Sequence, residues 1–212
     1  SSHQIRLPQD SEYSIDADAA EAFFHQWRGR LYGDAPNPTG RDGFVYIPLQ
    51  GKLLERRSFQ TMSPLEMVCS VLVADRKRHV VVTPHPKEKY GDAELTAINE
   101  LAQSEDRLTV SRAKGENLTK TCDYVATQNS SSVLAGYFYS KPAVLFAKID
   151  FHHIAANVEH VGVQAAIDAM DGELPEFARY LYWFLQLQAI NAGRPDAEAQ
   201  ILAAVRRHGW DI

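Results

Sequence analysis

A histidine between two prolines is the first residue whose position suggests chemistry. The stretch "VVVTPHPKEKYGD" (80–92) runs from a valine-rich segment directly into Pro84, His85 and Pro86. Proline fixes its own φ and restricts the residue before it, so both neighbours hold the backbone around the imidazole. An imidazole N–H donates hydrogen bonds to anions. His85 is therefore a candidate donor to a phosphate or carboxylate, and a loop histidine without a ligand is the alternative.

Three consecutive serines form the second candidate. In "TQNSSSV" (127–133) an apolar segment passes into an expected helix whose first turn contains Ser130, Ser131 and Ser132. The free N–H groups and hydroxyls at a helix start suit a phosphate or carboxylate. Capping the helix requires only one serine, which is the alternative interpretation. Because three exceed that need, we predict an anion site here and expect it to share one ligand with His85.

Other polar residues lie in the same loops and are candidate contacts of that ligand: Gln50, Lys87, Lys89, Asn129, Asp150, His152 and His153. The two lysines can equally be ordinary solvent-facing side chains. Adjacent histidines in an irregular segment rarely supply two ligands to one ion, and no Cys/His/Asp set with ligand spacing accompanies them. We therefore expect no metal. A P-loop, a glycine-rich dinucleotide motif and a G-x-S-x-G elbow are also absent from the sequence.

The elements that position these loops alternate between strand and helix. Strands are expected at 44–50, 79–84, 107–112, 123–129 and 142–150, and helices at 63–75, 92–106, 115–122 and 130–141. The helix at 63–75 has the clearest start, with Ser63 as N-cap, Pro64 next and Glu66 completing a capping box. Strands that are apolar on both faces indicate a parallel sheet covered on both sides. The predicted fold class is α/β, a Rossmann-like sheet with helices on both faces plus C-terminal helices, and its ligands should bind at the strands' carboxyl ends.

The two ends of the chain differ from this central part. We expect residues 1–40 to hold one amphipathic helix and a linker, 41–158 the Rossmann-like domain and 159–212 a C-terminal helical extension. Helices are expected in the extension at 161–170, 174–191 and 196–210. The middle one carries a broad apolar surface made of Phe177, Tyr180, Leu181, Trp183, Phe184, Leu185 and Leu187. Such a surface should dock on an absent domain or a second copy, or else cover the sheet.

Composition limits the function classes. The net charge is −5 with scattered Lys and Arg, so nucleic acid is not an expected partner. No apolar run of 18 residues and no secretory pattern occur, which predicts a cytoplasmic protein without a spanning helix. Cys69 and Cys122 are expected to be buried thiols rather than a disulfide or metal ligands.

The segments "FVYIPLQ" (44–50), "VVVTPHPKE" (80–88) and "CDYVATQNSSSVLAGYFYSKPAVLFAKIDFHHI" (122–154) together resemble a known family. They look like the C-terminal, donor-binding half of bacterial capsular polysaccharide glycosyltransferases of GT-B architecture, especially the Kdo transferases, over roughly residues 43–158. In that family, and in similar bacterial sialyltransferases, a His-Pro pair and a serine-rich helix start hold the phosphate of a CMP-activated sugar. The matching positions are His85, Pro86, Ser130, Ser131 and Ser132. The sequence departs from the family at Lys141, where a glycine is often found.

The resemblance implies a nucleotide-sugar donor, such as CMP-Kdo, and a glycan acceptor, with no cofactor and no metal. It also implies that the catalytic base belongs to an acceptor-binding domain preceding Ser1 in a longer parent enzyme. A further implication is that this parent enzyme associates peripherally with a membrane. No catalytic residue is therefore assigned, and whether the chain alone is an enzyme stays open. Two alternatives are a non-catalytic nucleotide-binding or assembly module and a nucleotide-sugar epimerase. The epimerase is disfavoured because "NSSSVLAG" lacks the Ser-Gly-Gly and the glutamate pair typical of that class.

Overall fold

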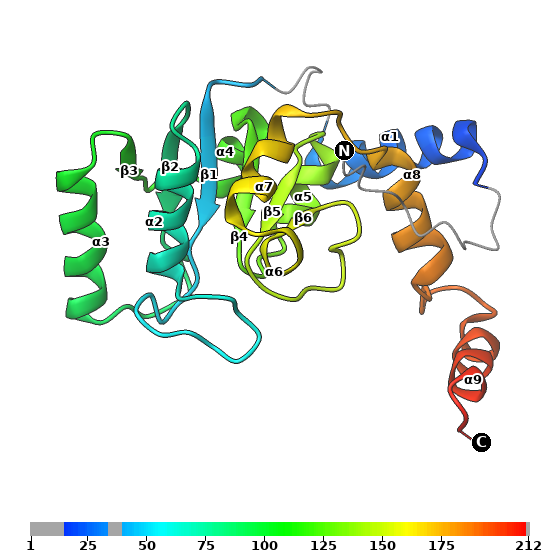
Figure 1. Cartoon of the computed structure of the whole chain (residues 1–212). Coiled ribbons are helices and arrows are strands. Elements are labelled where there is room, and N and C mark those ends of the chain that lie inside the picture. Colours follow the sequence, from blue (N-terminus) through cyan, green and yellow to red (C-terminus); the bar gives the residue numbers. More distant parts are fainter. Residues whose placement is uncertain (1–14, 34–39, 211–212) are drawn as a thin grey trace. The chain divides into compact units, whose positions relative to one another are not determined.

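The computed structural model describes residues 15–33 and 40–210. These residues divide into two compact units, one formed by 40–175 and the other by 15–33 together with 176–210. The expected linker around 34–39 and the first 14 residues lie outside the described part of the chain. Figure 1 labels the elements of both units, which are taken one at a time below.

The unit formed by 40–175 contains a sheet of six parallel strands in the order β3-β2-β1-β4-β5-β6. The strands are β1 (Phe44–Pro48), β2 (His79–Thr83), β3 (Leu108–Val110), β4 (Tyr124–Thr127), β5 (Ala143–Leu145) and β6 (Ala156–Asn157). The five predicted strands are present and the predicted α/β class is confirmed. The short β6 was not predicted, because two residues carry no periodic pattern.

Helices cover both faces of this sheet, as predicted. Residues of α2 (Pro64–Ala74), α3 (Asp92–Ser104) and α7 (Val163–Asp168) share one apolar core with Val45, Ile47 and Tyr124 of the strands. Alternation along a strand turns Tyr46 and Val125 to the opposite face. There Gly115 of α4 (Gly115–Thr121) lies against Tyr46, and Gly136 of α5 (Ser132–Phe138) lies against Val125.

Local chemistry explains where several elements begin and end. Ser63 and Glu66 form the predicted capping box at α2, with the Ser63 N–H donating to Glu66 Oε2 at 2.7 Å. The predicted helix at 161–170 is instead divided at Gly162, whose φ of 79° belongs to the left-handed region, between α6 (Val158–Val161) and α7. A 3₁₀ turn, Ala169–Asp171, follows α7. The strand predicted at 142–150 ends early, because Ala147 turns to pair antiparallel with Gln60.

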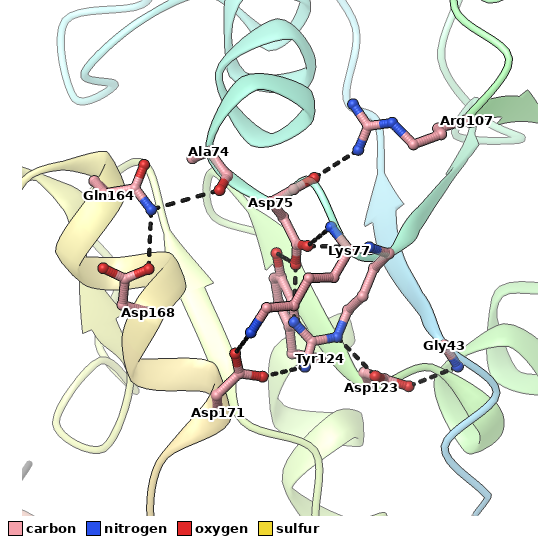
Figure 2. Close-up of polar contacts among 11 residues, drawn as sticks. Gly43, Ala74, Asp75, Lys77, Arg107, Asp123, Tyr124, Gln164, Asp168 and Asp171 are labelled. Atoms are coloured by element: carbon pink, nitrogen blue, oxygen red, sulfur yellow. Dashed lines mark hydrogen bonds and ion pairs between the residues drawn. The ribbon is translucent and has the colours of Figure 1, made fainter.

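Charged side chains meet at the amino-terminal edge of the sheet, next to the starts of β2 and β4. Figure 2 shows their convergence. Arg78 donates to Asp75 at 2.9 Å, to Asp123 at 2.7 Å and to Asp171 at 2.5 Å. Tyr124 donates its hydroxyl to Asp75 at 3.0 Å, and Asp123 also accepts the Gly43 N–H at 2.9 Å. We call Arg78, Asp75, Asp123, Asp171 and Tyr124 the Arg78 network; it joins segments that are up to 96 residues apart.

The pKa shifts in the Arg78 network follow from burial and pairing. Burial opposes the charge of Arg78, but its three carboxylate partners outweigh burial and raise the pKa of the guanidinium. Burial likewise opposes the charge of Asp75, yet hydrogen bonds from Arg78 and from the Lys77 N–H lower the pKa of that carboxyl. Burial and the Asp75 charge raise the pKa of Tyr124. Arg78 and Asp75 are thus held in their charged forms, Tyr124 keeps its proton, and the role of the network is structural.

The cysteines are both free thiols. Cys122 is fully buried, as predicted, and burial raises its pKa to about 12, so the thiol stays protonated at neutral pH. Cys69 is only half-buried, so the expectation of a buried thiol was too strong there.

The second unit is helical. It comprises α1 (Ala17–Tyr32), α8 (Phe177–Tyr182), a π-helical continuation from Trp183 to Gln188, and α9 (Ala197–Arg207). The Phe23 and Tyr182 rings meet edge to face at 5.4 Å, so α1 and α8 pack together within this unit. Phe177, Tyr180 and Leu181 are buried, so this part of the predicted apolar surface is covered in the chain itself. Docking on another domain or a second copy stays a prediction.

Among the described residues, no helix combines the length and apolar character needed to cross a membrane.

Candidate functional site

The strand order of the sheet reverses direction between β1 and β4. From β1 the chain moves to β2 and β3 on one side, and then returns to place β4, β5 and β6 on the other. In open α/β sheets ligands bind outside the carboxyl ends of the strands at this switch point. The loops that follow β1, β2, β4 and β5 at that edge carry every site residue predicted from the sequence.

The loop after β2 orients His85. The Lys87 N–H donates to His85 Nδ1 at 3.2 Å, and the His85 N–H donates to the Tyr90 hydroxyl at 2.7 Å. Because Nδ1 accepts a hydrogen bond, a neutral ring carries its proton on Nε2. His85 is exposed, so in the neutral ring Nε2–H is available as a hydrogen-bond donor. Lys87 and Lys89 are exposed residues of the same loop.

Two carboxylates lie beside the β1 loop, and one of them bonds it to the start of α3. Glu88 lies so close to Gly51 that a side chain at that glycine would collide with the carboxylate. Glu94 accepts the Gly91 N–H at 2.7 Å and also accepts the Leu53 N–H. The segment that contains Gln50 is therefore held beside the segment that contains His85.

The serine loop after β4 uses two of its three hydroxyls internally. Ser130 Oγ accepts the Ser132 N–H at 3.2 Å and lies 3.0 Å from Ser132 Oγ. The exposed Ser131 hydroxyl has no hydrogen-bond partner in the described part of the chain. α5 has only seven residues, so the hydroxyls matter here more than a helix dipole. Of the three serines, Ser131 is therefore the one whose hydroxyl is available for a further hydrogen bond.

The loop after β5 holds the two histidines in a fixed arrangement. Their rings stack with centroids 4.3 Å apart, and His152 Nδ1 donates to the Ile149 carbonyl at 2.5 Å. A neutral His152 therefore presents Nε2 as an acceptor, the reverse of His85. Burial, and secondarily His152, lower the pKa of His153. Asp150 is exposed, and no cluster of three or more His, Cys, Asp or Glu side chains suitable for a metal occurs among the described residues.

Two glutamines that the sequence did not single out organise the same edge. Gln128 is buried, donates to the Met62 carbonyl at 2.7 Å and accepts from the buried Gln60. Thr61 bonds the Phe146 carbonyl through both its N–H and its hydroxyl. The β1–α2 loop is thereby fixed to the start of the β5 loop. No local pattern predicts contacts between residues 66 or more positions apart.

The predicted residues thus lie on neighbouring strand ends. Gln50 follows β1, while Asn129 and the serines follow β4 across the switch point. His85 is one strand away on one side, and His152 and His153 are one strand away on the other. Lys141, the departure from the family pattern, precedes β5 at the opposite edge. It is buried and donates to the Gly40 carbonyl, and burial lowers its pKa.

No protein-family model matches this sequence, and no curated protein matches it. Solved structures that align with the chain include the following three. The Thermosulfurimonas dismutans KpsC β-Kdo 2,7 transferase aligns with a TM-score of 0.54 and 16% identity, over 92% of this chain and 64% of that chain. The Thermosulfurimonas dismutans KpsC β-Kdo 2,4 transferase aligns with a TM-score of 0.45 and 14% identity, over 77% of this chain and 53% of that chain. A GtfA/B complex aligns with a TM-score of 0.45 and 10% identity, over 91% of this chain and 45% of that chain.

The first of these likenesses carries the argument about architecture. It confirms the predicted α/β architecture, a parallel sheet with helices on both faces that corresponds to part of this β-Kdo transferase's fold. The chain spans about two thirds, 64%, of the length of the KpsC chain it matches. At 16% identity the match describes the fold, and function must be argued from the site.

Proposed function

We propose that this chain is the donor-binding part of a glycosyltransferase that uses a CMP-activated sugar, such as CMP-Kdo, in capsular or surface polysaccharide biosynthesis. The observation that carries the proposal is the position of two independent donors. His85 Nε2–H and the Ser131 hydroxyl lie on loops after β2 and β4, the two strands that flank β1 at the switch point. A leaving nucleoside monophosphate requires hydrogen-bond donors of this kind.

The remaining parts of the proposal concern what acts together with the chain. A glycan is the acceptor, and the base that deprotonates its hydroxyl comes from a separate acceptor-binding domain. A CMP leaving group carries a single phosphate, and so less negative charge than a nucleoside diphosphate. His85 and the serine hydroxyls can hold it without a metal, so we propose metal-independent donor binding. The proposed location is cytoplasmic, with the parent enzyme at the membrane periphery.

The first prediction tests the nucleotide class. CMP should raise the thermal unfolding midpoint more than UDP or GDP at equal concentration, and should do so without divalent metal. Ligand at about 100 times its dissociation constant adds about 2.7 kcal/mol to stability, which a thermal-shift assay resolves easily. A larger shift with UDP and Mg²⁺ than with CMP would contradict the proposed donor.

The second prediction tests the two donors. His85→Ala and Ser131→Ala should each weaken CMP binding by about 1–3 kcal/mol, the range for hydrogen bonds to charged groups. Both residues are exposed, so the unfolding midpoint without ligand should change little. Calorimetric titration measures the affinities, and Ser104→Ala, an exposed serine at the end of α3, is the matched control.

Because both donors contact one phosphate in this proposal, the double variant should lose less than the sum of the single losses. Unchanged CMP affinity in either single variant, or full additivity, is the result that argues against a shared phosphate.

A further inference from the structure

Three buried oxygen atoms near the switch point have no hydrogen-bond partner within the described chain. They are Gln50 Oε1, Thr127 Oγ1 and Asn129 Oδ1. Thr127 is completely buried. Buried polar atoms are nearly always paired in folded proteins, so a group of three unpaired ones at one place requires an explanation.

Strand register places the three residues together. β1 pairs with β4 at Val45–Tyr124 and Tyr46–Val125. Thr127 lies two residues beyond Val125 and therefore faces the same side of the sheet as Tyr46 and Val125, while Gln50 and Asn129 each come two residues after the ends of β1 and β4. That face is the one covered by α4 and α5.

The ladder between the two central strands also stops just before these residues. β1 pairs with β4 no further than Tyr46, whereas it pairs with β2 as far as Pro48–Thr83, and the Leu49 N–H still donates to the Thr83 carbonyl. The three unpaired oxygens therefore lie where β1 and β4 are no longer bonded to each other, which is where the switch-point rule places a ligand.

Neighbouring polar residues in the same edge are fully paired, so the unpaired ones are not a general property of this edge. Thr83 ends β2 on the same face, is also buried, and its Oγ1 bonds the Tyr46 hydroxyl at 2.9 Å. Gln128, between Thr127 and Asn129, has partners for both its amide oxygen and its amide nitrogen.

From this contrast we infer that Gln50, Thr127 and Asn129 form a subsite for hydroxyl groups of the ligand, a diol in particular. Two of the unpaired atoms are amide oxygens, which only accept hydrogen bonds, and the third is a hydroxyl, which both donates and accepts; none of the three side chains carries a charge. A phosphate offers only acceptors and cannot pair with the two amide oxygens, while a ligand hydroxyl donates one hydrogen bond and accepts others, so it matches all three atoms. The inference rests on the proposed function: the hydroxyls belong either to the ribose of the nucleotide or to the transferred sugar.

The subsite makes a prediction about stability without ligand. An unpaired buried hydroxyl is unfavourable, so the isosteric change Thr127→Val should raise the unfolding midpoint of the ligand-free protein by about 2–4 °C. Thr83→Val is the matched control on the adjacent strand end. It breaks the bond to Tyr46 and should lower the midpoint by a similar amount.

Ligand binding then identifies the hydroxyls. Wild type and Thr127→Val are titrated with CMP, with 2′,3′-dideoxy-CMP and with a CMP-sugar. Thr127→Val should bind at least one hydroxyl-bearing ligand about ten-fold more weakly, as expected when a buried hydrogen bond to substrate is lost. If the ribose diol is bound, wild type loses a similar factor with dideoxy-CMP and the variant does not discriminate. If the sugar is bound, only the CMP-sugar is weakened.

Two outcomes overturn this inference while leaving the proposed function intact. One is a Thr127→Val midpoint that falls like that of Thr83→Val, which would show that an internal water satisfies the hydroxyl. The other is CMP binding by wild type with no ligand weakened in Thr127→Val. If CMP and the CMP-sugar both fail to bind the wild-type protein, the proposed function falls, and this inference falls with it.

Discussion

Replacing Arg78 by methionine is expected to reduce the free energy of unfolding by about 3–5 kcal/mol, the cost of breaking a buried ion pair from one side. Arg78 is 9% exposed, and Asp75 is 3% exposed. Methionine preserves much of the side-chain volume but leaves Asp75 and Asp123 without their cation. Urea unfolding at neutral pH measures the loss through the change in midpoint.

Lys77→Met is the matched control for this prediction. Lys77 pairs with the same Asp171 at 2.7 Å, but its side chain is 76% exposed. Exposed ion pairs contribute little because water already solvates both charges, so this variant should unfold close to wild type. If Arg78→Met lowered the free energy of unfolding as little as Lys77→Met does, the Arg78 network would not be the main structural contact of the amino-terminal edge.

The parts of the fold that the sequence predicts are those encoded locally. Ser63, Pro64 and Glu66 predict the start of α2 because capping involves residues three positions apart. Apolar strands alternating with helices predict the parallel sheet, since only a covered sheet buries both strand faces. From that, the carboxyl-end rule places the His85 and Ser131 loops at one edge.

The parts that escaped prediction depend on contacts distant in sequence. The partners of Arg78 are 3, 45 and 93 residues away, and nothing at position 78 indicates that it is buried. The pairing of α1 with α8 joins the two ends of the chain in the same way. Thr127 was not predicted as a site residue, because it is distinguished by a buried hydroxyl without a hydrogen-bond partner among the described residues. A sequence pattern does not show such a missing partner.

The two edges of the sheet therefore differ in a way that the sequence conceals. At the amino-terminal edge the charges are paired within the chain, as the contacts of Arg78 show. At the carboxyl edge, within the described residues, the buried Thr127 hydroxyl and the exposed Ser131 hydroxyl have no hydrogen-bond partner. Stability and function often separate in this manner, because binding groups must stay unpaired until a ligand arrives.

Acid should weaken the wild-type protein through the Arg78 network. Hydrogen bonds from Arg78 outweigh burial to lower the pKa of Asp75, and hydrogen bonds from Lys77 and Arg78 lower that of Asp171. Aspartate in the unfolded chain has a pKa of about 3.9, so the stability that Asp75 and Asp171 contribute is fully present above that pH. They are lost as the pH falls through the lower folded-state values, because the unfolded chain then binds more protons than the native one.

Arg78→Met should respond to acid differently, and this gives the second large effect. Without the guanidinium, burial becomes the dominant influence on Asp75 and favours its protonated form. Each unit by which the folded-state pKa differs between the two proteins is worth about 1.4 kcal/mol. The stability gap between wild type and variant should therefore narrow by about 1–2 kcal/mol between neutral pH and pH 3, as measured by urea unfolding at each pH. As a control, Thr83→Val changes no charge, so it should lower the free energy of unfolding by the same amount at neutral pH and at pH 3. A gap for Arg78→Met that also stays constant would mean that Asp75 keeps its charge without Arg78, and that its backbone donors and Tyr124 suffice to hold it.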